Sequence, residues 1–191
     1  GVNAFRFGDF RWSSGHRDYS DIDFDQYLNR LQERVDQGNG TERELLESII
    51  FSYGDVTSQS DWTYWCEKTP RNELHLEKAL KWWPDLRAVY ILRDPRDNYA
   101  SHLRTIERHG GSLSLTKFVT NWCRSIGAWE RFSAHHPHGL LLRYRDLVMY
   151  PRPTLQRLCD FLEIGWHDNL LQPTRNGVLW SGNSMNKTEF D

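Results

Sequence analysis

The stretch over residues 86–101 constrains the fold of this chain more than any other. It reads Leu-Arg-Ala-Val-Tyr-Ile-Leu-Arg-Asp-Pro-Arg-Asp-Asn-Tyr-Ala-Ser. The apolar run at its start is rich in residues that favour strands, and it predicts a strand buried on both faces, as in a parallel sheet covered by helices. Asp94 then serves as an N-cap, and Pro95 suits the first helical position. A strand, a charged turn and a helix start follow one another here, which indicates an α/β fold.

The charged turn in this stretch is where we expect a ligand. In open α/β sheets, ligands bind beyond the carboxyl ends of the strands, where helix N-termini also favour anions. Arg93 and Arg96 lie at that position, and Ser101 lies about two turns into the helix, on the face shared with Asp94 and Asp97. Spacing alone leaves an alternative open, in which Arg93 forms a local ion pair with Asp94 or Asp97.

Composition limits the classes of function. The chain has 191 residues, an ordinary size for one domain. Its formal net charge of −2 argues against a dedicated nucleic-acid binder. Cys66, Cys123 and Cys159 lie far apart without CxxC spacing, which indicates neither a zinc site nor a disulfide framework. The histidines around Pro137 lack a helical ligand geometry and a nearby acidic partner, so a solvated loop is favoured over a metal site. No apolar run approaches the ~20 residues needed to cross a bilayer.

Hydrophobic periodicity and turn residues predict alternating helices and strands along most of the chain. A capping-box pattern from Thr41 to Glu44 marks one helix start. From Gly165 onward the chain is predicted to be irregular. The expected helices cover 24–37, 41–53, 72–83, 94–107, 115–135 and 151–161, and the expected strands cover 64–68, 86–92 and 139–144.

Each of the three predicted strands ends in a polar or basic turn. These turns are Lys68-Thr-Pro, Arg93-Asp-Pro-Arg and Arg143-Tyr-Arg-Asp. Ser101 follows Arg93 by eight residues. In this interval and in the three turns, the chain resembles the sulfotransferase superfamily, most closely its bacterial and Golgi-type enzymes. The resemblance covers roughly residues 64–184. It implies a P-loop NTPase-like sulfotransferase fold, in which a parallel sheet is flanked by helices in three layers.

The resemblance also implies a co-substrate and roles for individual residues. The co-substrate would be 3′-phosphoadenylyl sulfate (PAPS), with no metal. Arg93 and Ser101 would hold its 3′-phosphate by a charge-assisted fork and a hydroxyl donor, and Tyr144 would contact the adenine. Lys68 would lie near the transferred sulfonate and the leaving phosphate.

A general base must also take the proton of the acceptor. Members of the family supply a Glu or His for this purpose. Glu67 and His75 are the preferred candidates in this chain, and Asp9 and His16 are further ones.

The chain departs from the family pattern at one point. The Gly-rich loop that cradles the 5′-phosphosulfate should precede these motifs, and nothing like it occurs in this sequence. Because the chain also begins without Met, we expect this loop and the first strand to lie upstream, and residues 1–191 to form one partial, N-terminally truncated domain. Its expected parts are a helical, acceptor-side segment over 1–62, a nucleotide-binding α/β core over 63–164 and an irregular C-terminal segment over 165–191.

The expected reaction is sulfuryl transfer from PAPS to a hydroxyl or amine of a carbohydrate, lipid or small-metabolite acceptor. The bacterial cytoplasm is the expected compartment, and the Golgi lumen is the alternative if a membrane anchor lies upstream. Two other functions stay open. One is a P-loop kinase-like phosphotransferase, which would need a Mg²⁺-binding Ser/Thr and Asp. The other is a nucleotide-binding pseudoenzyme or interaction module that lacks the loop.

Overall fold

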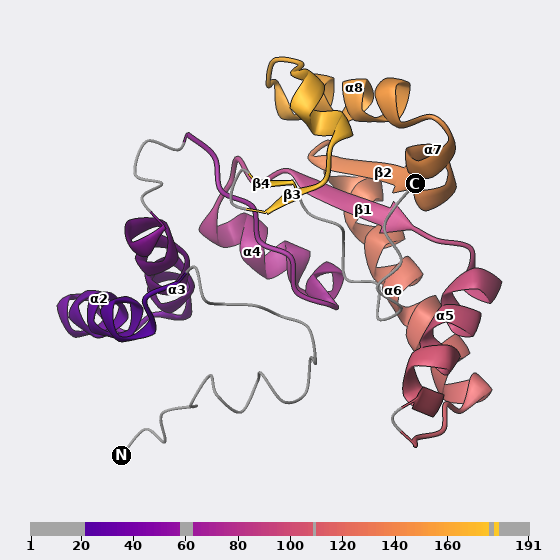
Figure 1. Cartoon of the computed structure of the whole chain (residues 1–191), viewed down its shortest axis with the longest axis horizontal. Helices are drawn as coiled ribbons and strands as arrows, with labels where there is room; N and C mark the ends of the chain where they lie inside the picture. Colours follow the sequence, from indigo (N-terminus) through magenta and orange to yellow (C-terminus); the bar gives the residue numbers. More distant parts are fainter. Residues whose placement is uncertain (1–21, 58–62, 109, 176–177, 180–191) are drawn as a thin grey trace. The chain divides into compact units, whose positions relative to one another are not determined.

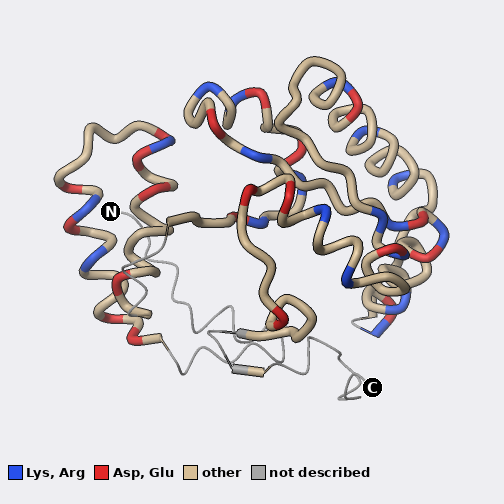
Figure 2. The backbone as a smooth tube through the Cα atoms, turned by 90° about the horizontal axis from the view of Figure 1, so that it is seen from above, with Lys and Arg blue, Asp and Glu red and all other residues tan. Residues whose placement is uncertain are grey.

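A computed structural model describes residues 22–57, 63–108, 110–175 and 178–179 of the chain (Figure 1). The chain divides into two compact units. The first unit comprises Gly1–Cys66 together with Pro173–Asp191, and the second unit comprises Glu67–Gln172. Basic and acidic residues are interspersed along the described chain (Figure 2), in keeping with the net charge of −2. Among the described residues, no helix is long and apolar enough to cross a membrane.

The first unit contains a helical hairpin of α2 (Phe24–Gln37) and α3 (Glu42–Val56). Both helices begin at side-chain caps. Asp23 Oδ1 accepts a hydrogen bond from the N–H of Gln26 at 2.9 Å. At the start of α3, the Thr41 hydroxyl accepts from the N–H of Glu44, and the Glu44 carboxylate accepts from the N–H of Thr41. This confirms the capping box that the sequence predicts.

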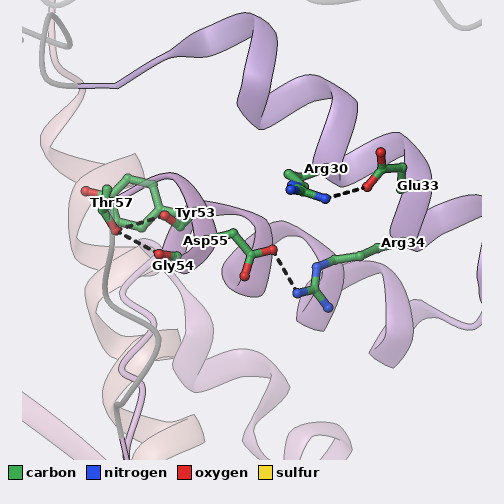
Figure 3. Close-up of polar contacts among 7 residues, drawn as sticks. All are labelled: Arg30, Glu33, Arg34, Tyr53, Gly54, Asp55 and Thr57. Atoms are coloured by element: carbon green, nitrogen blue, oxygen red, sulfur yellow. Dashed lines mark hydrogen bonds and ion pairs between the residues drawn. The ribbon is translucent and has the colours of Figure 1, made fainter.

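Small residues let α2 and α3 pack closely. Ser48, Ser52 and Gly54 are the buried residues of α3, and Tyr27 is the buried residue of α2. An ion pair between Arg34 Nη and Asp55 Oδ2 at 2.8 Å joins the two helices (Figure 3). Also in the first unit, β3 (Thr174–Arg175) and β4 (Val178–Leu179) pair as a short antiparallel hairpin.

The second unit is built on a small parallel sheet. Strands β1 (Ala88–Leu92) and β2 (Gly139–Arg143) pair in parallel, with Ala88 opposite Gly139 and Leu92 opposite Arg143. This confirms the predicted α/β fold with a parallel sheet. The prediction of a third strand over 64–68 is wrong, because that segment is irregular and this sheet has two strands among the described residues. A strand needs a neighbouring strand to pair its backbone groups, and residues 64–68 pair with no strand among the described residues.

Helices α4 (Leu76–Trp82) and α6 (Leu115–His135) cover one face of this sheet (Figure 1). The core on this face comprises Ala88, Trp129 and Phe132. Tyr90 stacks on Trp129 with 5.1 Å between the ring centroids, and its hydroxyl lies 2.8 Å from Ser125 Oγ. Large aromatic side chains therefore join β1 to α6.

Helix α8 (Pro151–Leu162) packs against β2 on the other side of the sheet, where Leu142 and Cys159 are each 1% exposed. The face of β1 on this side stays open, with Val89 39% and Ile91 53% exposed. The prediction that the strand over 86–92 is buried on both faces is therefore wrong, because α8 shields β2 and not β1.

The connecting elements complete the second unit. The 3₁₀ helix η1 (Asn72–His75) precedes α4, so the helix predicted over 72–83 is split into two. Helix α5 (Pro95–Arg108) follows β1, α7 (Tyr144–Met149) follows β2, and η2 (Asp168–Leu171) lies beyond α8. Arg87, just before β1, donates to the Phe161 carbonyl and pairs with Glu163 at 2.6 Å. These contacts tie the start of the sheet to the end of α8.

Candidate functional site

Arg93 and Tyr144 lie side by side at the carboxyl edge of the sheet. Each one directly follows the last residue of its strand, and those last residues, Leu92 and Arg143, are paired in the parallel register. The guanidinium carbon of Arg93 lies 5.0 Å from the centroid of the Tyr144 ring. That distance is within the range of a cation–π contact. The structure thus brings together two of the residues predicted for the nucleotide site.

The guanidinium of Arg93 has unused hydrogen-bonding capacity. The side chain is half-buried, and its Nε is buried without a hydrogen-bond partner. Within the described part of the chain, Arg93 forms no ion pair with a carboxylate. A buried donor without a partner costs free energy, and an arginine fork suits a bound oxyanion. This environment can therefore accept an anionic ligand.

The ion pair in the turn after β1 is formed by Asp94 and Arg96. Arg96 Nη lies 2.8 Å from Asp94 Oδ2, and Arg96 Nε donates to Oδ1 at 3.0 Å. The side-chain and backbone hydrogen bonds from Arg96 lower the pKa of the Asp94 carboxyl to about 2. The local ion pair considered for Arg93 and Asp94 is therefore made by Arg96, which directs its Nε and one Nη toward Asp94.

Helix α5 begins as the sequence predicts. Asp94 Oδ1 accepts a hydrogen bond from the N–H of Arg96 at 2.9 Å, which is an N-cap bond, and Pro95 is the first helical residue. Ser101 lies on this helix and is half-buried. Its carbonyl accepts a hydrogen bond from Thr105 Oγ1 at 3.1 Å, and its hydroxyl makes no hydrogen bond within the described residues.

The segment around Lys68 forms a tight polar turn. The Glu67 carboxylate accepts hydrogen bonds from the Thr69 hydroxyl and from the side-chain amide of Asn72. The N–H of Asn72 also donates to the Thr69 carbonyl at 3.2 Å. Arg71 adopts the left-handed region at φ 77°, and η1 begins at the next residue. Both oxygens of the predicted base Glu67 are thus used inside this turn.

The remaining predicted residues make no contact with the Arg93–Tyr144 pair within the described part of the chain. Lys68 and His75 are exposed, and His75 is the last residue of η1. No hydrogen bond, ion pair or ring contact among the described residues links Lys68 or His75 to Arg93 or Tyr144. The other two base candidates, Asp9 and His16, lie outside the described residues.

One prediction about the histidines is wrong. His136 has an acidic partner, because its Nε2 lies 3.0 Å from Glu77 Oε2 on α4. Sequence reasoning missed this pair because the two residues are 59 positions apart. A pocket of about 280 Å³ opens beside them, between the η1–α4 segment and α6. In the part of the chain that the structure describes, no group of three or more His, Cys, Asp or Glu could hold a metal ion.

Comparisons with known proteins agree with this architecture. The Sulfotransferase family matches residues 9–168. Protein-tyrosine sulfotransferase 1 of Danio rerio is 26% identical over 84% of this chain and 46% of its own length. Cytosolic sulfotransferase 16 of Arabidopsis thaliana is 26% identical over 48% of this chain and 31% of its own length. The chain therefore spans less than half the length of each of these relatives.

A solved structure has the same fold. The sulfotransferase domain from the curacin biosynthetic pathway superposes with a TM-score of 0.56, at 19% identity over 85% of this chain and 67% of that one. A match at this identity is evidence for the fold alone. The parallel sheet with helices on both sides, together with the family match over residues 9–168, leads to one conclusion. This chain belongs to the sulfotransferase family.

Proposed function

We propose that this chain takes part in the transfer of a sulfuryl group from PAPS to a hydroxyl or amine of a carbohydrate, lipid or small-metabolite acceptor. The observation that carries the proposal is the half-buried guanidinium of Arg93, whose buried Nε has no partner. Such a cation at the carboxyl end of a parallel strand fits a phosphate group. Membership of the family favours PAPS over a nucleoside triphosphate as the source of that phosphate.

Three residues of the second unit would hold the nucleotide. Arg93 would donate its free N–H groups to the 3′-phosphate, and the hydroxyl of Ser101, which makes no hydrogen bond within the described residues, would add a donor from α5. Tyr144, to which the family resemblance assigns the adenine, would lie beside the guanidinium of Arg93. Bound PAPS would supply an activated sulfuryl group and a good leaving group.

Lys68 would act at the other end of the nucleotide. In sulfuryl transfer, as in phosphoryl transfer, negative charge develops on the leaving oxygen, and catalysis depends on a cation positioned beside that oxygen more than on covalent help from the protein. Lys68 is exposed and has no ion pair among the described residues. Its turn is held by the hydrogen bonds of Glu67 to Thr69 and Asn72, which give its backbone a defined path.

For the general base, the contacts favour His75 over Glu67. A base must be free to turn toward the proton of the acceptor. Both oxygens of Glu67 already accept hydrogen bonds within the turn, whereas His75 is exposed and has no hydrogen bond within the described residues. Glu67 would then serve to shape the turn that carries Lys68.

The decisive experiment is Arg93→Ala in the full-length protein. We expect the affinity for adenosine 3′,5′-bisphosphate, measured by calorimetry, to fall by about 2 kcal/mol or more, the scale of a lost hydrogen bond to a charged group. Arg108→Ala is the matched control, because Arg108 is an exposed arginine at the end of α5 that makes no contact with the turn. Equal affinities of the wild type and Arg93→Ala would contradict the proposal.

A further inference from the structure

We infer that Tyr144 is a positioning residue for Arg93: its ring fixes the orientation of the guanidinium that receives the phosphate. This inference rests on the proposed function and deepens it. The observation that supports it is the distance of 5.0 Å between the Arg93 guanidinium carbon and the Tyr144 ring centroid. The family resemblance gives Tyr144 a contact with adenine, and the role inferred from the contact is a different one.

The backbone holds the two residues in register. Leu92 and Arg143 are the last paired residues of the parallel strands, so the next residue of each strand leaves the sheet at the same edge. Tyr144 is also the first residue of α7. The end of that helix is fixed by Thr154, which is 4% exposed and donates from Oγ1 to the Asp146 carbonyl at 3.0 Å. The ring of Tyr144 therefore projects from the first residue of a helix that is hydrogen-bonded to α8.

Arg93 depends on this ring because its side chain has no other partner within the part of the chain that the structure describes. Its Nε makes no hydrogen bond, and the carboxylate of the adjacent Asp94 accepts hydrogen bonds from Arg96. The face of an aromatic ring attracts a guanidinium and also restricts its rotation. Among the described residues, Tyr144 is the only aromatic ring that lies within cation–π distance of Arg93.

Ring and phosphate use different surfaces of the guanidinium. An oxyanion binds in the guanidinium plane, at the N–H edges, whereas an aromatic ring packs against the planar face. Both contacts can therefore exist at once. If the ring of Tyr144 holds the guanidinium of Arg93 in place before the phosphate binds, aligning its N–H edges with the phosphate costs less entropy. Loss of the ring should thus weaken the recognition of the 3′-phosphate specifically.

A double-mutant cycle with two nucleotides tests this inference in the full-length protein. Adenosine 3′,5′-bisphosphate carries the 3′-phosphate, and adenosine 5′-phosphate lacks it. We expect Tyr144→Leu to weaken bisphosphate binding by about tenfold and monophosphate binding by less than about threefold. Arg93→Ala with Tyr144→Leu should bind the bisphosphate about as well as Arg93→Ala alone, because the ring acts through Arg93.

Two variants separate the ring from its hydroxyl and from general destabilisation. Tyr144→Phe keeps the ring and should retain wild-type affinity for both nucleotides. Tyr150→Leu is the matched control, since Tyr150 is a 62% exposed tyrosine just after the same helix. Three results would each overturn the inference. Tyr144→Leu could lose equal affinity for the two nucleotides, or the losses of affinity could add in the double variant. The third is a Tyr144→Phe variant that binds as weakly as Tyr144→Leu.

A second measurement needs no nucleotide. In proton–nitrogen NMR spectra, the Nε–H signal of Arg93 should be shifted upfield by the ring of Tyr144. We expect this shift to persist in Tyr144→Phe and to disappear in Tyr144→Leu. If the wild type bound neither nucleotide, the proposed function would fail, and the NMR signal would still decide the inference. An Arg93 signal unaffected by Tyr144→Leu would overturn it.

Discussion

Arg96 donates two side-chain hydrogen bonds to the carboxylate of Asp94, from Nε to Oδ1 at 3.0 Å and from Nη to Oδ2 at 2.8 Å. The N–H of Arg96 donates to the same Oδ1 at 2.9 Å. One carboxylate thus caps α5 and neutralises one of the two arginines that follow β1. Arg93 is left with its Nε unpartnered, so its guanidinium has hydrogen-bonding capacity for an anion.

The Asp94–Arg96 pair predicts a specific dependence of stability on pH. Hydrogen bonds from Arg96 lower the pKa of Asp94 from 3.8 to about 2. A carboxyl whose pKa is lower in the folded state stabilises the fold above its unfolded-state pKa, and this stabilisation is lost as the pH falls toward the folded-state value.

We therefore expect Asp94→Asn to lower the Tm at pH 7, and the difference from the wild type to shrink between about pH 4 and pH 2. Thermal unfolding followed by circular dichroism at several pH values would measure this. Asp85→Asn removes an exposed carboxylate that forms no ion pair among the described residues, and it serves as the control. A difference that stayed constant over this pH range would contradict the role of the pair.

Lys68 is expected to act on turnover more than on nucleotide affinity. In Lys68→Ala, kcat should fall by about a hundredfold, the scale of removing one group that stabilises charge in the transition state. The affinity for adenosine 3′,5′-bisphosphate should change by less than about threefold. Steady-state kinetics with labelled PAPS, paired with calorimetry, would separate the two effects. Lys117→Ala, at an exposed lysine of α6, is the matched control, and normal turnover of Lys68→Ala would remove Lys68 from the chemistry.

Glu67 and His75 should differ in their pH–rate profiles. In Glu67→Gln, the new amide can still accept a hydrogen bond from Thr69, so kcat should fall little and the profile should keep its shape. In His75→Gln, kcat should fall by about a hundredfold or more, and the limb of the profile that reports the base should be lost. The reverse pattern, with that limb lost in Glu67→Gln, would identify Glu67 as the base.

Phe132 is expected to be the most costly truncation in the second unit. Its side chain is 1% exposed and packs with Trp129 and Ala88 between α6 and the sheet. Phe132→Ala should lower the free energy of unfolding by about 3–5 kcal/mol, because it removes buried apolar surface and leaves a cavity. Urea denaturation measures the loss. Val148→Ala, at a valine that is 58% exposed, should cost little, and equal costs for the two variants would contradict the assignment of this core.

Features that depend on neighbouring residues could be read from the sequence. The capping box of Thr41 and Glu44 and the start of α5 at Asp94 and Pro95 were predicted correctly, because a cap involves groups within one turn of a helix. The parallel pairing of the two core strands was predicted from the apolar runs and the helices between them. The position of Arg93 beyond a strand end followed from the same pattern.

The features of the fold and the site that the sequence did not predict depend on contacts between distant segments. Residues 64–68 have strand-like composition but pair with no strand among the described residues, and Ile91 is exposed because α8 covers β2 instead of β1. The ring beside Arg93 and the pairing of Glu77 with His136 both depend on where whole elements pack. Local propensity sets which elements form, whereas the choice of partner for a half-buried charge depends on which side chains the folded chain brings within a few ångströms of it. For Arg93, that side chain is the ring of Tyr144.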